Sequence, residues 1–364
     1  MSDNTSYVFA GDTAVGEGIV GSLARAGFTA AADLAQAGVV FTYHPTQSGL
    51  EELYFGDDGI VAQVAAGTVF VNLSPAAPSF SSELYQLCSV YECNYVEAPL
   101  VVRDVTVEDA FAEPGNLLVF AAGEQGAFDE VEPQLSALAR MVEFVGGIGA
   151  AQTAKVVHTL QNATGLMGIV EAFASTQASK ADFDGEAYLD ALESAGLVSP
   201  AQVAFVEALN AGDFEGSYTL GLMMAELAVA LTAVEDEEMV LPLGDAAFHL
   251  FELLAIVGGA NYTPAALKLL FADEEAGKAA GLDWSRAEHD HDHECDCADK
   301  DDPDHECSCG HHHHRHDDEL DQGVGHHHHQ DEDAFDEEGN YNEFGGYGTP
   351  STSDYIVDEV DDWN

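Results

Sequence analysis

The sequence predicts an α/β domain with a mostly parallel sheet, then an all-α domain, then a disordered acidic tail. Three observations predict this order. Short apolar runs alternate with helix-period segments over residues 1–148, which is the pattern of a parallel sheet covered by helices. Only helix-period segments follow over residues 149–283. Over residues 284–364 apolar residues become sparse, and such a segment cannot bury enough surface to offset its conformational entropy.

The strands of the first domain are predicted from short runs rich in Val and Phe, each bounded by Gly or polar residues. They are YVFAG (7–11), GVVFTYH (38–44), GTVFVNLS (67–74), NYVEAPL (94–100) and NLLVFAAG (116–123). Helical periodicity occupies residues 79–92, and residues 127–147 supply a last helix and a last strand. Strands and helices that alternate in this way predict a parallel sheet with helices on both faces.

The second domain is predicted to contain only helices, most with Ser, Thr, Asp or Gly near their ends as caps. The helical segments are 150–180, 185–196, 199–212, 220–238, 243–259 and 263–280. Their apolar content predicts a homodimer formed through this domain.

The charge of the chain is strongly negative. Its 364 residues include 66 Asp and Glu against 10 Lys and Arg, for a net charge of −56. Such a surface repels nucleic acid and anionic membranes, so neither is an expected partner. A high-salt habitat, a solubility adaptation and a habit of the source proteome all remain open as reasons. No basic leader or membrane-length apolar run is present, which predicts a cytoplasmic protein.

Residues 7–28 open like a dinucleotide-binding turn, with an apolar strand, a glycine turn and then a helix. The G-x-G-x-x-G pattern has Gly11 and Gly16 at its outer positions and Thr13 at the middle one. The predicted cofactor contacts of this turn are Gly11, Thr13, Ala14, Val15 and Gly16. Thr13 adds bulk where a pyrophosphate approaches the backbone, and Asp12 adds negative charge, so we expect weakened binding.

Three further landmarks follow in order. Asn72–Pro78 resembles an Asp-x-Ser-Thr-x-x-Pro signature, residues 95–100 (YVEAPL) stand where a substrate-loop strand belongs, and residues 147–163 begin a helix that contains Lys155. With the glycine turn, residues 7–270 resemble the β-hydroxyacid dehydrogenase family, which includes 3-hydroxyisobutyrate dehydrogenases and imine-reductase-like relatives. The resemblance implies a Rossmann-like NAD(P)-binding domain and a small hydroxy acid or imine as substrate. It also implies that Lys155 is the catalytic residue, which assists hydride transfer by hydrogen bonding and proton transfer.

The chain departs from the family pattern at several chemical positions. Val101, Val102 and Arg103 stand where the family has Ser-Gly-Gly, and of these only Arg103 offers a substrate carboxylate a charge. Thr159 replaces an Asn one turn after the lysine, and Ala225-Glu226 replaces a later Lys-Asp pair. These losses leave open whether the chain is an active enzyme.

The segment that normally binds the adenosine ribose of the cofactor is predicted to be short. Residues 27–45 leave little room for a second strand, a helix and a third strand, and Asp33 is either a ribose-binding acid or a helix cap. No Lys or Arg lies between Arg25 and Arg103, so a bound cofactor is expected to be NAD rather than NADP. His44 and Ser74 are the remaining predicted cofactor contacts. Weak NAD binding and no binding both stay open.

The histidine-rich tail contains a repeat that predicts metal binding. DHDHECDC (290–297) recurs as DPDHECSC (302–309), and thiolate and imidazole suit Zn, Ni, Co or Cu. The predicted ligands are His291, His293, Cys295, Cys297, His305, Cys307, Cys309, His311, His312, His313 and His314. The alternative function is therefore a non-enzymatic protein that binds, stores or delivers transition-metal ions. Residues 334–364 are either a docking peptide for a protein partner or a solubilising tail.

Overall fold

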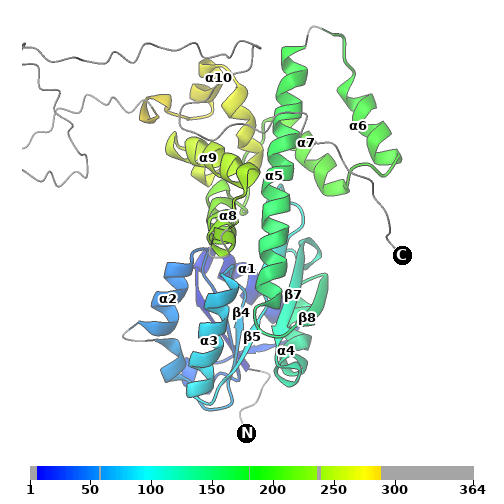
Figure 1. Cartoon of the computed structure of the whole chain (residues 1–364). Helices are drawn as coiled ribbons and strands as arrows, with labels where there is room; N and C mark the ends of the chain where they lie inside the picture. Colours follow the sequence, from blue (N-terminus) through cyan, green and yellow to red (C-terminus); the bar gives the residue numbers. More distant parts are fainter. Residues whose placement is uncertain (1–5, 57–58, 180, 236–238, 288–364) are drawn as a thin grey trace, which may run out of the picture. The chain divides into compact units, whose positions relative to one another are not determined.

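The computed structural model describes residues 6–56, 59–179, 181–235 and 239–287. The predicted metal ligands and residues 334–364 lie outside these residues. The described chain has a sheet domain followed by helices, and the long helix α5 (Ala150–Ala178) leads from one into the other (Figure 1). The predicted α/β class is confirmed.

The sheet has eight strands and is mostly parallel. Its order is β2-β1-β3-β4-β5-β7-β6, with β8 paired to β7, and β7 runs antiparallel to β5 and β6. The strands are β1 (Ser6–Gly11), β2 (Thr29–Ala30), β3 (Val39–Tyr43), β4 (Val69–Asn72), β5 (Asn94–Glu97), β6 (Leu100–Val102), β7 (Leu117–Gly123) and β8 (Met141–Gly146). The prediction of one strand over 94–100 was wrong, because the chain leaves the sheet at Ala98 and Pro99, and proline has no N–H for the ladder.

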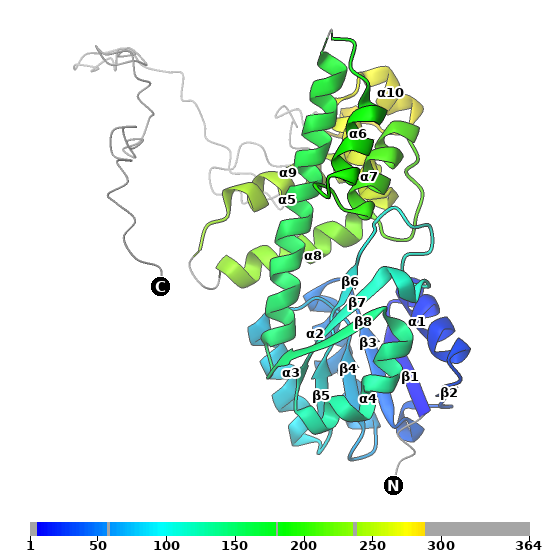
Figure 2. The same ribbon diagram turned by 90° about the vertical axis from the view of Figure 1, so that its right-hand side faces the viewer.

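Helices cover both faces of the sheet, each with its own core (Figure 2). α1 (Thr13–Arg25) and α4 (Gln125–Leu138) contact each other on one face, where Ile19, Leu23 and Val131 are buried. α2 (Gln47–Phe55) and α3 (Pro78–Val90) bury Leu50, Tyr54 and Leu84 in the second core. Because β1, β3 and β4 run parallel, their carboxyl ends lie at one edge of the sheet, where ligands of such sheets bind.

The two glycines that survive in the turn are the ones that the fold itself needs. Gly11 has φ +128, and a Cβ there would lie 2.0 Å from the carbonyl oxygen of Tyr43. A Cβ on Gly16 would lie 2.4 Å from the ring of Phe9. The middle glycine, whose role is to let a phosphate approach, is the one replaced by Thr13.

The second domain contains only helices among the described residues after Gly146, as predicted. They are α5, α6 (Gly185–Ser194), α7 (Pro200–Ala211), α8 (Leu220–Glu235), α9 (Pro242–Ile256) and α10 (Glu274–Ala279), with 3-10 turns between and after them. The prediction of one helix over 263–280 was wrong. Pro264–Phe271 form a 3-10 helix, and Asp273 caps α10 by accepting a hydrogen bond from Ala276 N at 2.8 Å.

The folded chain extends slightly beyond residue 283. Trp284–Arg286 form a 3-10 turn, and the Trp284 side chain packs against the main core beside Gly277. No helix among the described residues is long and apolar enough to span a bilayer.

Candidate active site

Lys155 lies in a buried ion pair. Its Nζ is 2.8 Å from Oε2 of Glu226, and the two side chains are 3% and 6% exposed. α5 contributes the lysine and α8 the glutamate, and these helices pack closely together (Figure 1). Because an unpaired charge is costly in the interior, each residue requires the other.

Tyr43 and Tyr218 lie near the Lys155–Glu226 ion pair. The Tyr218 hydroxyl donates a hydrogen bond to Oε2 of Glu226 at 2.8 Å. Burial, followed by the charge of Glu226, raises the pKa of both Tyr43 and Tyr218 well above the usual range. Both hydroxyls therefore stay protonated and can only donate or accept hydrogen bonds. Among the described residues, the Tyr43 hydroxyl and the Thr159 hydroxyl are buried without a partner.

Glu97 fixes the start of the helix that contains Lys155. Its carboxylate, at the end of β5, accepts hydrogen bonds from the backbone N–H of Gly149 and, at 3.1 Å, from that of Gln152. A carboxylate at a helix N-terminus is favoured by the free amides and the helix dipole. Burial nevertheless raises the pKa of Glu97 to about 7, although these two hydrogen bonds lower it.

We expect Glu97 to make stability fall as pH rises. Its pKa is about 7 in the folded chain against 4.5 ordinarily, so the folded state binds more protons between these values. This contribution is complete below the lower value and is lost as pH rises through the upper one. In Glu97→Gln, Tm should therefore fall less between about pH 5 and pH 8 than in the unmodified chain. Thermal melts at fixed ionic strength measure this, and equal slopes in the two proteins would contradict it.

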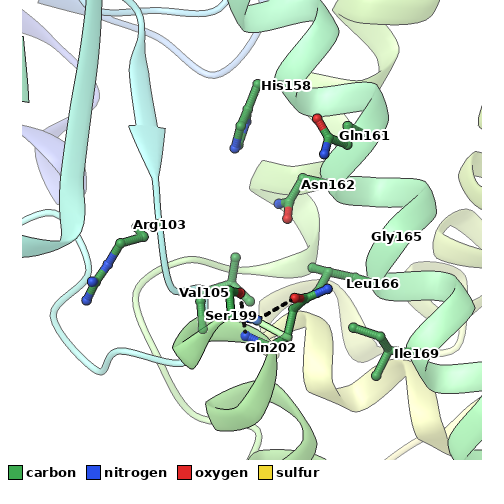
Figure 3. Close-up of a pocket in the computed structure, with 11 residues that line it drawn as sticks. Arg103, Val105, His158, Gln161, Asn162, Gly165, Leu166, Ile169, Ser199 and Gln202 are labelled. Carbon is green, nitrogen blue, oxygen red and sulfur yellow. Dashed lines mark hydrogen bonds between the residues drawn. The ribbon is translucent and has the colours of Figure 1, made fainter. Parts of the chain in front are cut away.

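A cavity of about 410 Å³ lies beside the lysine helix, between α5, the start of α7 and the loop after β6. Figure 3 shows the His158 imidazole and the amides of Gln161 and Asn162 directed into it from α5, with the Arg103 guanidinium directed away. Burial, and then the charge of Lys155, lower the pKa of His158 to about 4, so its imidazole is neutral at neutral pH. Its Nδ1 has no hydrogen-bond partner among the described residues. The cavity thus presents uncharged donors and acceptors to a small polar molecule.

The amides at the start of α1 already have an acceptor. The Asp12 carboxylate accepts hydrogen bonds from the N–H groups of Ala14 and Val15 at 2.9 and 3.2 Å. A dinucleotide pyrophosphate would use these same amides, so it must displace the carboxylate. Thr13 is exposed at the first position of α1, whereas Val15 is buried in the core. The amides of this turn can therefore bind a phosphate, but the Asp12 carboxylate competes with the phosphate for them.

A second cavity, of about 620 Å³, adjoins this turn at the carboxyl edge. Its lining includes Gly11, Asp12, His44, Gly49 and Glu52. Ser74 does not face it. That side chain is buried, and its hydroxyl accepts a hydrogen bond from His44 N at 2.9 Å, so Ser74 positions His44. Of the predicted cofactor contacts, Gly11 and His44 thus line the same cavity. Ser74 does not line it and instead hydrogen-bonds to the backbone of His44.

No group of three or more His, Cys, Asp or Glu side chains in the described part of the chain is arranged to hold a metal ion. The predicted metal ligands of the tail lie beyond those residues.

A glycine turn at a parallel sheet edge, with a buried lysine on the first helix of a following helical domain, defines an NAD(P)-binding oxidoreductase class. The family model for the NAD binding domain of 6-phosphogluconate dehydrogenase matches residues 4–147. The model for the NAD-binding domain of NADP-dependent 3-hydroxyisobutyrate dehydrogenase matches residues 149–270. The chain belongs to the 3-hydroxyisobutyrate dehydrogenase-like β-hydroxyacid dehydrogenase family.

Known proteins are similar to most of the described chain. The chain is 25% identical over 219 residues to 2-(hydroxymethyl)glutarate dehydrogenase of Eubacterium barkeri, covering 60% of this chain and 70% of that protein. It is 26% identical over 260 residues to NAD-dependent L-serine dehydrogenase of Pseudomonas aeruginosa, covering 70% and 86%. The solved structure of Mycobacterium tuberculosis 3-hydroxyisobutyrate dehydrogenase with L-serine has the same fold, with TM-score 0.62, 20% identity and coverage of 74% and 99%.

Sequence reasoning missed the surroundings of the lysine. It named Glu226 only as a departure from the family pattern, and it did not name Tyr43 or Tyr218. One signal was available, because Glu226 is the acid in an otherwise apolar helical run, LGLMMAELAVAL. A carboxylate that is buried in this way requires a charged or hydrogen-bonding partner.

Proposed function

We propose that the chain is an NAD-dependent oxidoreductase of the β-hydroxyacid dehydrogenase type, and that Lys155 handles the proton in its reaction. The observation that carries this proposal is the buried Lys155 ammonium with Glu226 as its counter-ion. An ammonium has three N–H donors, and among the described residues Glu226 is its one ion-pair partner. Two donors therefore remain for a substrate oxygen or nitrogen.

A nicotinamide cofactor, when bound, supplies or accepts the hydride. The residues of this chain then have separate tasks. Lys155 Nζ donates a hydrogen bond to the reacting oxygen and passes a proton to it or takes one from it. Glu226 compensates the ammonium charge, and the buried Tyr43 hydroxyl offers a further hydrogen bond in the same region. Gly11 and the start of α1 would hold the cofactor phosphates once Asp12 has moved away.

The proposed substrate is a small hydroxy acid or an imine. The cavity beside α5 supports a small substrate, because its volume is about 410 Å³ and its polar lining includes His158, Gln161 and Asn162. The side-chain amides of Gln161 and Asn162 can donate to a carboxylate, whereas the Arg103 guanidinium is directed away from the cavity (Figure 3). The named activities of the relatives, on hydroxymethylglutarate and L-serine, belong to the same substrate class.

The test is a fluorescence titration with NADH and NADPH, followed by turnover with a panel of small hydroxy acids and cyclic imines. We expect NADH to bind more tightly than NADPH, because residues 26–102 contain no Lys or Arg to pair with a 2′-phosphate. Lys155→Met/Glu226→Gln should lower turnover by about 10²–10⁴-fold and leave NADH binding intact. Absence of binding at millimolar cofactor would rule out the proposed function.

We further propose that the tail binds transition-metal ions through the two His-Glu-Cys-x-Cys units at 293–297 and 305–309. This proposal is supported by the ligand types and their repetition in the sequence. Metal bound to the full chain and to a chain that ends at Ala287, which keeps the folded residues, should be compared by elemental analysis after loading with Zn²⁺ or Ni²⁺. Equal metal content in the two would rule out a tail site.

We also propose a homodimer through the helical domain. Apolar side chains are exposed at the start of α9, where Val240 is 77% and Leu243 is 75% exposed. Two large apolar side chains that are both exposed and only three residues apart in the sequence support an association surface. Light scattering of the unmodified chain and of Leu243→Glu tests it, since the variant should shift toward monomer.

A further inference from the structure

The strand beside β1 ends well before the cofactor edge. β2 pairs with β1 only at Ser6–Thr29 and Tyr7–Ala30. β1 continues through Val8–Gly11, and its last residue pairs with Tyr43 of β3. At about 3.3 Å per residue, β2 therefore ends about 13 Å short of the level of Gly11.

The chain then turns back and does not approach that edge. Ala31 N donates to Tyr7 O, and Gly38 N donates to Ser6 O at the amino end of β1, from which β3 starts. The segment between them is a single 3-10 turn (Leu34–Gln36), whose Gln36 O accepts from the Ser6 hydroxyl. The crossover helix that a mononucleotide-binding half normally has at this point is replaced by this turn.

Asp33, the residue at the expected distance for a ribose-binding acid, is engaged elsewhere. Its carboxylate accepts from Gln36 N at 3.1 Å and from Gln36 Nε2 at 2.8 Å, as the cap of the 3-10 turn. In dinucleotide-binding folds, the acid that holds the adenosine ribose stands at the carboxyl end of the second strand. No residue of the described segment 29–38 reaches that position.

The cavity of about 620 Å³ beside the glycine turn does not provide an anion-binding surface where the second strand is missing. Among the described residues, the charged side chains in its lining are the carboxylates of Asp12 and Glu52. His44 also lines it, and its Nδ1 lies 3.3 Å from Thr46 N and 3.1 Å from the Thr46 hydroxyl. A phosphate in this cavity would therefore meet carboxylates and, in the described part of its lining, no cation.

We infer that the site recognises the nicotinamide mononucleotide part of its cofactor and that the adenylate part contributes little to binding. This inference rests on the proposed function, because it assumes that the glycine turn holds a nicotinamide nucleotide. It goes beyond that function by assigning the ligand class to a mononucleotide with one phosphate, seated between the start of α1 and the end of β3. The adenylate half of NAD then extends past the truncated edge into solvent.

The test compares reduced nicotinamide mononucleotide with NADH by fluorescence titration of the full chain. The expected dissociation constants agree within about 3-fold, and AMP at millimolar concentration does not displace either ligand. Binding of NADH more than about 30-fold tighter than the mononucleotide would overturn the inference and leave the proposed function standing. Binding of neither would overturn both.

Two variants test whether an acidic side chain near the site contacts the adenosine of NADH. Asp33→Ala removes the acid at the ribose spacing, and Glu52→Gln removes the acid of the neighbouring cavity. Both should change the ratio of the two dissociation constants by less than about 2-fold. A selective loss of NADH affinity in either variant, with mononucleotide affinity unchanged, would overturn the inference and identify the ribose contact.

Discussion

Replacing Lys155 with methionine is expected to lower the free energy of unfolding by about 3–5 kcal/mol, because it leaves the Glu226 carboxylate buried and unpaired. The Glu226 side chain is 6% exposed, and the Tyr218 hydroxyl also donates a hydrogen bond to its carboxylate. Methionine has nearly the length of lysine, so little cavity is created. The measurement is urea denaturation at neutral pH.

The matched variant removes both charges. In Lys155→Met/Glu226→Gln, the glutamine oxygen still accepts from Tyr218 and no charge remains buried. We expect most of the lost stability to return, to within about 1 kcal/mol of the unmodified chain, since replacement of a whole buried pair is often nearly neutral. The single and double variants together with Glu226→Gln complete a double-mutant cycle. Additive effects would show that the two side chains do not form a buried ion pair in solution.

The same double variant separates catalysis from folding. If Lys155 handles the proton, turnover should fall by about 10²–10⁴-fold in the double variant although its stability is restored. Affinity for NADH should stay unchanged, because the cofactor phosphates are assigned to the turn before α1. Turnover that returned with stability would mean that the lysine has only a structural role.

Much of the fold was predictable because buried parallel strands and helices have different apolar periods. The β-branched and aromatic runs located β1, β3, β4 and β7, and the loss of such runs after Gly146 located the helical domain. The errors came from backbone features without a periodic signal. Pro99 divided one predicted strand, and the segment 264–271 adopted a 3-10 helix although its apolar spacing suits an α-helix.

The candidate site was less predictable, since its contacts join segments that are distant in sequence. Lys155 meets Glu226 across two helices, and Asp12 meets amides whose availability depends on its side-chain rotamer. Sequence reasoning placed a negative charge near the phosphates but did not predict that the carboxylate itself occupies the amides. It also could not decide whether Asp33 binds the cofactor ribose or caps a helix. The hydrogen bonds that Asp33 accepts from Gln36 show that it caps the 3-10 turn.

Replacing Asp12 with asparagine is expected to tighten NADH binding by about 10-fold, which corresponds to about 1.4 kcal/mol. The carboxylate repels a phosphate that approaches the amides of Ala14 and Val15, and asparagine removes this charge although its side-chain oxygen still accepts from the amides. Asparagine is an equally good N-cap, so the free energy of unfolding should change by less than about 0.5 kcal/mol. Glu17→Gln, an exposed position on the same helix, removes the same charge without touching the amides. Its effect on NADH affinity should be below about 2-fold, and equal effects in the two variants would contradict a local role for Asp12.

The salt dependence of this difference separates the two ways in which Asp12 acts. At about 1 M salt the Debye length is about 3 Å, so repulsion between the carboxylate and a phosphate is strongly reduced. Occupation of the amides is a short-range hydrogen-bonded contact and is screened much less. The difference between Asp12 and its asparagine variant should therefore shrink at about 1 M salt, whereas a gain in NADH affinity in Asp12→Gly, which frees the amides, should persist if the side chain acts as a competitor for the amides. That outcome would explain why Gly11 and Gly16 are kept while the middle glycine is not: the outer two serve packing, and the phosphate position between them is filled by the chain itself.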